Sequence, residues 1–224
     1  MLVTGSSILT PAAAQQLHIV NTNQEYQQSL KRDSSFEMVE LKSVIPTLVY
    51  DLRYATTNNF TGKQLYKRGK ETYMRAPAAA ALQRVQAMLA QQGLGLKIWD
   101  AYRPYAVTET MWNMIKDERY VANPAKGSGH NRGLAVDVTI INLATGKELN
   151  MGTGYDNFTD TAHHTFTQLP PDVQQNRTLL KNTMERAGFT ALQTEWWHYY
   201  WPNNKNYDVL NLSFQQLAKT SKGK

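Results

Sequence analysis

The order of strand-type and helix-type segments is the feature of this sequence that most constrains its fold. Four segments are rich in β-branched and aromatic residues and predict strands: 47–54, 96–102, 135–141 and 195–201. Three segments combine helical spacing of apolar residues with start or stop signals and predict helices: 78–92, 104–116 and 176–187. The two kinds are mixed without a regular strand–helix–strand rhythm, so the sequence predicts an α+β domain.

Composition excludes several classes of protein. The chain of 224 residues contains no cysteine, which excludes disulfides, thiolate catalysis and cysteine-bound zinc. No run of about 18 apolar residues exists that could span a membrane. The formal net charge is +6, but the last six residues hold three of the lysines and the other basic residues are scattered. A nucleic-acid partner is therefore not expected.

The two ends of the chain differ from the middle. Residues 1–14 carry no charge and end in Pro-Ala-Ala-Ala, which is typical of the close of a secretory signal peptide. The basic start of such a signal is missing, so export to the periplasm is only slightly favoured over a cytoplasmic location. Residues 15–35 are rich in Gln, Asn and Ser and predict a linker. The boundaries are then 1–35 for a possible signal remnant and linker, 36–218 for the domain, and 219–224 for a basic tail.

His130 and Asp137 stand close together in the sequence. His130 lies in a glycine-rich loop, and the strand that follows alternates apolar residues with Asp137 and Thr139. A carboxylate inside such a strand is costly to bury unless a cation meets it. Taken alone, Asp137 is explained by an ion pair with an arginine, and His130 by an ordinary hydrogen-bonded loop histidine.

His198 changes this interpretation because a glutamate, Glu195, precedes it by three residues. Two histidines and one aspartate (His130, His198 and Asp137) form a three-ligand set that leaves a fourth zinc position open, as catalytic zinc sites do. Glu195 is then free to act as a general base. Residues 195 and 198 of a regular strand face opposite sides, so the backbone must bulge or turn between them.

Arg103 follows one predicted strand and precedes a predicted helix, at a kind of junction where sites are common. The alternative is a surface arginine whose stem packs on Tyr102 or Tyr105. Position alone favours that alternative.

The motifs occur in an order that resembles one known family, the zinc D-alanyl-D-alanine dipeptidases of the vancomycin-resistance type, within the D-Ala-D-Ala metallopeptidases. The resemblance rests on SxHxxGxAxD at 128–137, followed by ExWH at 195–198. Three further segments agree and extend it over most of the domain: DLRYAT at 51–56 with NFTG at 59–62, DAYRP at 100–104, and MGTGYD at 151–156.

The resemblance implies a role for each matching residue. It implies one zinc ion per chain held by His130, Asp137 and His198, with Glu195 as the base. Arg103 would stabilise the tetrahedral intermediate, and Ser128 and Asp156 would meet the free ammonium group of a small dipeptide. Tyr155, at a position where the family allows Phe, is expected to leave the chemistry unaffected. The implied fold is a single α+β domain with a central antiparallel sheet flanked by helices and the zinc site on the sheet.

The expected activity is hydrolysis of D-alanyl-D-alanine to two D-alanines. Two alternatives stay open on the residues alone. One is a D,D-carboxypeptidase or endopeptidase acting on cell-wall peptides, which would share the zinc site and differ in the pocket. The other is a non-catalytic zinc-bearing binding module, which would be expected to lack Glu195 or Arg103. His163 and His164 are expected in loops near the rim of the site.

Overall fold

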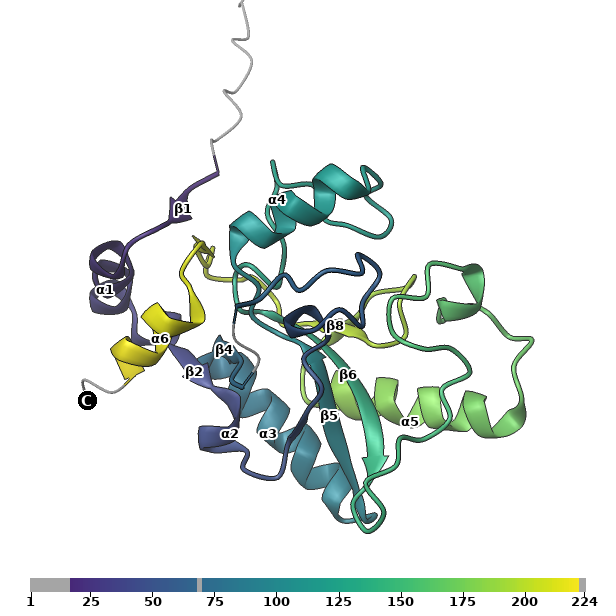
Figure 1. Cartoon of the computed structure of the whole chain (residues 1–224). Helices are drawn as coiled ribbons and strands as arrows, with labels where there is room; N and C mark the ends of the chain where they lie inside the picture. The colour runs from purple at the N-terminus through teal and green to yellow at the C-terminus, as the bar shows by residue number, and fades with distance from the viewer. Residues whose placement is uncertain (1–16, 68–69, 222–224) are drawn as a thin grey trace, which may run out of the picture.

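The computed structural model describes residues 17–67 and 70–221, and Figure 1 shows their arrangement. The helices are α1 (Asn23–Arg32), α2 (Leu41–Val44), α3 (Ala76–Ala90), α4 (Tyr105–Met114), α5 (Pro171–Arg186) and α6 (Phe214–Ser221). The strands are β1 (Ile19–Val20), β2 (Met38–Glu40), β3 (Val49–Tyr50), β4 (Tyr73–Arg75), β5 (Leu94–Asp100), β6 (Ala135–Asn142), β7 (Thr190–Ala191), β8 (His198–Tyr200) and β9 (Val209–Leu210). The proposed signal remnant, 1–14, lies outside the described residues. None of the helices in the described ranges has the length and apolar character needed to cross a bilayer.

The largest sheet has five strands in the order β3-β5-β6-β8-β7. The pairs β5–β6, β6–β8 and β7–β8 are antiparallel, whereas the edge strand β3 pairs with β5 in parallel. The protein therefore has a mixed α/β fold with a mixed sheet, and the expectation of an antiparallel sheet is wrong at this edge. The other two sheets are pairs of short strands, β1–β9 and β2–β4.

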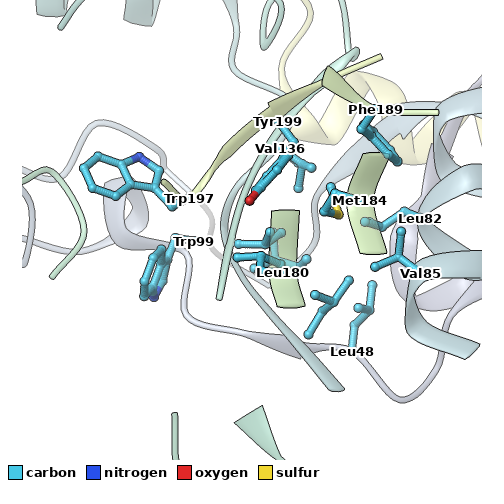
Figure 2. Packing of buried hydrophobic residues seen from close by; sticks show 14 of the residues in the cluster. Leu48, Leu82, Val85, Trp99, Val136, Leu180, Met184, Phe189, Trp197 and Tyr199 are labelled. Atoms are coloured by element: carbon cyan, nitrogen blue, oxygen red, sulfur yellow. The ribbon is translucent and has the colours of Figure 1, made fainter. Parts of the chain in front are cut away.

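The main hydrophobic core joins the central strands to α3 and α5. Val136 on β6, Leu82 and Val85 on α3, and Leu180 and Met184 on α5 are all fully buried members of one cluster, which Figure 2 shows from close by. Burying each such side chain contributes about 1.5–3 kcal/mol. Because side chains alternate along a strand, packing Val136 toward this core turns its neighbour Asp137 to the opposite face. The core thus fixes the face of β6 on which the polar residues lie.

Several predicted elements have other bounds in the structure. The predicted strand 47–54 reduces to β3, after which a short 3-10 helix, Arg53–Ala55, follows. The predicted helix 176–187 begins five residues earlier, because Pro171 occupies the first turn and Asp172 lies near the positive end of the helix dipole. The residues of the first turn thus decide where α5 begins, whereas pairing with β5 decides how much of 47–54 becomes strand.

The segment predicted as a linker is structured wherever it is described. Thr22 and Glu25 form a capping box that starts α1, and Tyr26 of this helix is buried and bonds the backbone N–H of Met38. Many of the polar residues of this segment therefore belong to the exposed face of a docked helix, Asn23–Arg32. At the other end, α6 runs on to Ser221, so the first residues of the predicted tail are helical.

Candidate active site

The glycine-rich loop 127–133 is held by hydrogen bonds of its own. The backbone N–H of Ser128 bonds the side-chain oxygen of Asn131, and the Ser128 hydroxyl accepts from the backbone N–H of His130 at 3.1 Å. Asn131 is fully buried and also donates to the carbonyl of Arg103 and the hydroxyl of Thr108. The loop is therefore tied directly to the segment that carries Arg103.

A buried arginine, Arg75, fixes the far side of the same loop. Its guanidinium donates to the carbonyls of Phe36, Arg132 and Asp208, and no part of the residue is exposed. Gly133 has a φ of +69°, and a Cβ there would lie 2.6 Å from the Met38 side chain. A larger residue here would have to displace the end of the Met38 side chain and adopt a left-handed conformation that favours glycine.

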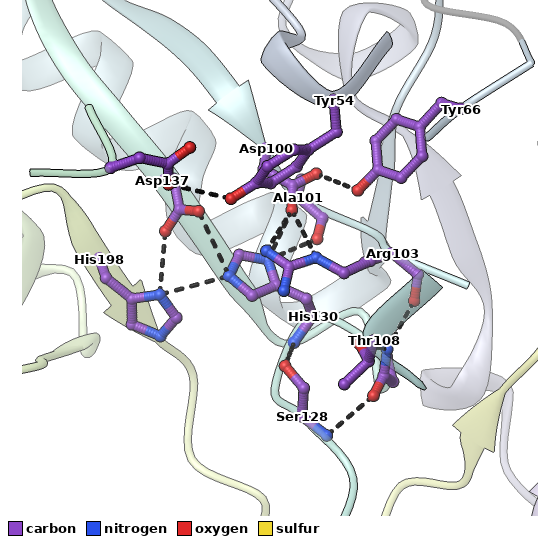
Figure 3. A network of polar contacts seen from close by, with 12 residues as sticks. Tyr54, Tyr66, Asp100, Ala101, Arg103, Thr108, Ser128, His130, Asp137 and His198 are labelled. Atoms are coloured by element: carbon purple, nitrogen blue, oxygen red, sulfur yellow. Dashed lines mark hydrogen bonds and ion pairs between the residues drawn. The ribbon is translucent and has the colours of Figure 1, made fainter. Parts of the chain in front are cut away.

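The ring of His130 is oriented by a contact with a backbone carbonyl. Its Nδ1 lies 2.7 Å from the carbonyl oxygen of Ala101, which can only accept, so Nδ1 carries the proton. In the neutral ring Nε2 is then unprotonated, and it faces Asp137 and His198 (Figure 3). A backbone carbonyl that fixes the tautomer in this way is usual for metal-binding histidines.

Asp137 and His198 come from adjacent strands and are direct partners in the β6–β8 register. Oδ1 of Asp137 lies 2.9 Å from Nδ1 of His198, and its Oδ2 lies 3.4 Å from Nε2 of His130. The two histidine nitrogens are 3.2 Å apart. Within 17–67 and 70–221, the ion-pair partners of Asp137 are these two histidines and no arginine, so the described structure does not support the alternative of an arginine ion pair.

These three residues fit a tetrahedral zinc ion. Donor atoms about 2.0–2.2 Å from such an ion lie about 3.4 Å apart, close to the separations of 2.9, 3.2 and 3.4 Å in this cluster. The set contains two imidazoles and one carboxylate, which are zinc's preferred ligands besides thiolate. Burial alone would raise the pKa of Asp137, but His130 and His198 hold it well below its usual range, so the carboxylate is ionised as a ligand must be.

Glu195 lies beside this cluster without belonging to it. The backbone turns between Glu195 and His198, whose N–H bonds the Glu195 carbonyl at 3.2 Å, and this confirms the turn that the sequence requires. Oε2 of Glu195 lies 3.8 Å from Nδ1 of His198. Glu195 is only 8% exposed and its carboxylate accepts no hydrogen bond from the described residues. Burial raises its pKa to about 8, and strongly shifted carboxyl groups in clefts are common at functional sites.

Arg103 is buried and forms an ion pair with Asp100, so the alternative of a surface arginine is wrong. Its Nε and Nη2 donate to Oδ2 of Asp100 at 3.0 and 2.8 Å, and Tyr66 donates to Oδ1 at 2.6 Å. Asp100 ends β5 at a register shift and is wholly buried. Burial alone would lower the pKa of Arg103, but Asp100 outweighs it and keeps the pKa well above its ordinary value. The guanidinium is thus a fixed positive charge at the wall of the cavity.

Asp156 lies across the cavity in a strained backbone. Its φ of 56° is in the left-handed region, which aspartate tolerates better than most residues. Its carboxylate accepts from the Tyr54 hydroxyl at 2.9 Å and from the Phe60 N–H at 3.5 Å. Burial raises its pKa to about 7, since these neutral partners do not offset the loss of water. Among the residues that the structure describes, no cation forms a direct ion pair with Asp156.

One cavity of about 260 Å³ joins all seven of the residues that the sequence singles out: Arg103, Ser128, His130, Asp137, Asp156, Glu195 and His198. His163 and His164 do not line it. His164 instead packs near Tyr199, where burial lowers its pKa to about 4.

Sequence reasoning missed the residues that hold the others in place: Tyr54, Tyr66, Asp100 and Asn131. Asp100 lies in the DAYRP segment that suggested Arg103, and this was the available signal for it. Tyr155 was expected to be inert, yet its hydroxyl donates to Oδ2 of Asp137 at 2.9 Å. It therefore contacts one member of the metal-ligand set directly.

Replacing Asp100 with asparagine should lower kcat by roughly 10–100-fold, the usual effect of losing a partner that orients a functional group. The change leaves Arg103 in a buried position without its counter-charge and free to turn from the cavity. The measurement is kcat for the single and double variants with Arg103→Ala. Because Asp100 acts through Arg103, Asp100→Asn should cost nothing further in the double variant. Independent, additive losses would contradict this, and Glu148→Gln, which breaks the half-exposed pair with Lys97, is the control.

Two histidines and an aspartate around an open cavity, with a free glutamate and a fixed arginine beside them, define a zinc metallopeptidase. A family model described as D-ala-D-ala dipeptidase matches residues 34–218, and the chain belongs to this family.

Characterised relatives agree with the family assignment. The chain is 35% identical over 174 residues to a D-alanyl-D-alanine dipeptidase of Escherichia coli (strain K12), covering 78% of this chain and 89% of the relative. It is 33% identical over 181 residues to a D-alanyl-D-alanine dipeptidase of Enterococcus faecium, covering 71% and 88%. A solved structure of VanYB in complex with D-alanine-D-alanine is 15% identical, with a TM-score of 0.40 over 70% of this chain and 81% of that one. That structural likeness is too low to support an argument about the site.

Proposed function

We propose that this protein hydrolyses free D-alanyl-D-alanine to two D-alanines in a zinc-dependent reaction. The single observation that carries the proposal is the metal-ligand set His130, Asp137 and His198 in one cavity with Glu195 and Arg103. The family and the dipeptidase relatives point to the same reaction. In this proposal the zinc site lies on the sheet, since two of the ligands come from the adjacent strands β6 and β8.

Zinc bound at this site supplies a Lewis acid that acidifies water to a pKa of about 7 and polarises the peptide carbonyl. Glu195 takes the proton of the attacking water and passes it to the nitrogen of the leaving D-alanine. Its Oε2 lies 3.8 Å from Nδ1 of His198, and no hydrogen-bond donor in the described part of the chain engages it, which suits a group that must accept and release a proton. Such a general base is worth roughly 10²–10⁴ in rate.

Arg103 stabilises the negative charge that develops on the carbonyl oxygen. Asp100 and Tyr66 hold its guanidinium before substrate arrives, so little reorganisation is needed during the reaction. A fixed donor of this kind accounts for roughly 10²–10³ in kcat.

Asp156 and Ser128 meet the free ammonium group of the dipeptide. Asp156 is a buried carboxylate with two neutral donors, and an ammonium group would supply the missing counter-charge. A charge-assisted contact of this kind contributes about 1.5–3 kcal/mol. The Ser128 hydroxyl accepts from His130 and keeps a lone pair for a second donor. Recognition of the amine favours a dipeptidase over a carboxypeptidase, whose wall-peptide substrate has no amine at that position.

The test compares kcat/KM for D-Ala-D-Ala and N-acetyl-D-Ala-D-Ala. Acetylation removes the positive charge and leaves Asp156 unpaired, so the capped dipeptide should be a poorer substrate by roughly tenfold to hundredfold. Asp156→Ala should slow hydrolysis of the free dipeptide and narrow the difference between the two. If the unmutated enzyme cleaves the capped substrate equally well or better, the protein is a D,D-carboxypeptidase that uses the same zinc site. If it cleaves neither, the catalytic proposal is wrong.

A further inference from the structure

Three aromatic side chains from separate loops meet at the cavity. Phe60 belongs to the loop after the 3-10 helix, Tyr120 to the loop after α4, and Phe158 to the segment after Asp156. The rings of Phe60 and Phe158 are 5.3 Å apart and edge-on, and those of Tyr120 and Phe158 are 4.6 Å apart and stacked. Phe60 and Tyr120 line the cavity, whereas Phe158 lies between them and is not in the lining.

This aromatic group begins at the carboxylate proposed to bind the amine. The backbone N–H of Phe60 donates to Asp156, and the Phe60 ring also packs edge-on against Tyr54, whose hydroxyl bonds the same carboxylate. Phe158 is two residues beyond Asp156. The side of the cavity beyond the proposed ammonium position is therefore bordered by aromatic rings, which occupy space that a longer peptide would need.

Both loops that flank Phe158 are internally braced. The Asn59 side chain bonds the carbonyls of Arg53, Thr56 and Lys63. In the loop after α4, Glu118 accepts from Asn123 and Lys126. The rings thus join two stiff loops across one edge of the cavity.

We infer that Phe60, Tyr120 and Phe158 form an aromatic clasp that closes the amine side of the cavity and excludes peptides extended beyond a free amino group. The inference rests on the proposed function and adds a steric basis for dipeptide specificity to the electrostatic one at Asp156. The cavity volume of about 260 Å³ is below the roughly 300–1,000 Å³ of sites for drug-sized ligands, in keeping with a small substrate. Specificity then comes from a barrier against longer peptides as well as from attraction of the dipeptide.

The experiment measures kcat/KM of the zinc enzyme and its Phe158→Ala variant on three substrates: D-Ala-D-Ala, N-acetyl-D-Ala-D-Ala and the tripeptide Gly-D-Ala-D-Ala. Opening the clasp should raise kcat/KM for both longer substrates by about tenfold or more, the scale on which pocket fit changes this quantity. In Phe158→Ala, the ratio of kcat/KM for a longer substrate to kcat/KM for the free dipeptide therefore rises because the longer substrate is cleaved faster. In Asp156→Ala the same ratio rises because the free dipeptide is cleaved more slowly, so the two effects are distinguishable.

Tyr120→Leu is the second variant, in case Phe158→Ala does not fold, and melting temperature and zinc content verify both. Phe189→Leu, which removes a ring that packs on Trp201 and does not line the cavity, is the matched control and should leave the ratio unchanged. The clasp is wrong if a folded, zinc-loaded variant cleaves the longer substrates no faster than the unmutated enzyme. Failure of the unmutated enzyme to cleave D-Ala-D-Ala would instead overturn the proposed function.

Discussion

Replacing Glu195 with glutamine should lower kcat for D-Ala-D-Ala by roughly 10²–10⁴ while one zinc ion per chain remains bound. Glutamine has the shape of glutamate but cannot take a proton from water. The zinc ion should stay because Glu195 is outside the proposed ligand set: its Oε2 lies 3.8 Å from Nδ1 of His198, whereas the proposed ligand atoms lie 2.9–3.4 Å from one another. The expected signature is a large fall in kcat with little change in KM.

Zinc content and kinetics measured on the same preparation check this assignment. Glu185→Gln, which changes an exposed glutamate paired with Lys181 on α5, is the matched control and should behave as the unmutated protein. If Glu195→Gln loses zinc before it loses turnover, Glu195 is a ligand and the proposed division of roles is wrong. If turnover stays near normal with zinc bound, another group accepts the proton.

The central strands could be predicted from sequence, whereas the edges of the fold could not. In the segment 135–141, apolar residues alternate with Asp137 and Thr139, and a glycine-rich loop precedes it. This pattern agrees with the role of the segment in the fold, where β6 covers Ala135–Asn142. The segment 47–54 has equal β propensity, but only Val49 and Tyr50 find a partner strand. Pairing with a neighbour, which local sequence does not encode, decides how much of such a segment becomes strand.

The prediction of a linker at 15–35 failed over Asn23–Arg32 for a related reason. The composition of this segment is typical of a linker, but α1 needs only a few apolar contacts to dock. Tyr26 packs in a buried cluster with residues of α4 and α6, and Asp208 binds Ser29 and Arg32 of the helix. These partners lie more than 80 residues away along the chain. A window of local composition cannot include them.

The sequence could predict which residues gather in the cavity, but it could not predict the residues that hold them in place. The spacing of His130, Asp137, Glu195 and His198 reflects chemistry that restricts residue type, so the motif is visible in one chain. Asp100 bonds Arg103 and Tyr155 bonds Asp137. The DAYRP segment places Asp100 near Arg103 in the sequence, but neither segment shows which side chain each residue contacts. Tyr155 is an example. Because the family allows Phe at this position, nothing in the sequence indicates that the Tyr155 hydroxyl bonds Asp137, a proposed metal ligand.

Substituting His198 with alanine should remove stoichiometric zinc and, with it, hydrolysis of D-Ala-D-Ala. The remaining residues, His130 and Asp137, provide two ligands, which is one fewer than catalytic zinc sites use. Asp137 would also be left buried, at 2% exposure, with less compensation for its charge. The effect on activity should therefore exceed that of Arg103→Ala, which removes one fixed donor and leaves the metal in place.

Metal analysis after dialysis and kinetics before and after chelation provide the measurement. The unmutated protein should hold one zinc per chain, lose metal and activity together to a chelator, and regain both on addition of Zn²⁺. Its melting temperature should rise with zinc, because a ligand that binds only the folded state stabilises it by mass action. His163→Ala, which alters a half-buried histidine outside the cavity, should keep full zinc content and serves as the control. An active preparation without stoichiometric metal would end the zinc mechanism, and normal zinc content in His198→Ala would remove that residue from the ligand set.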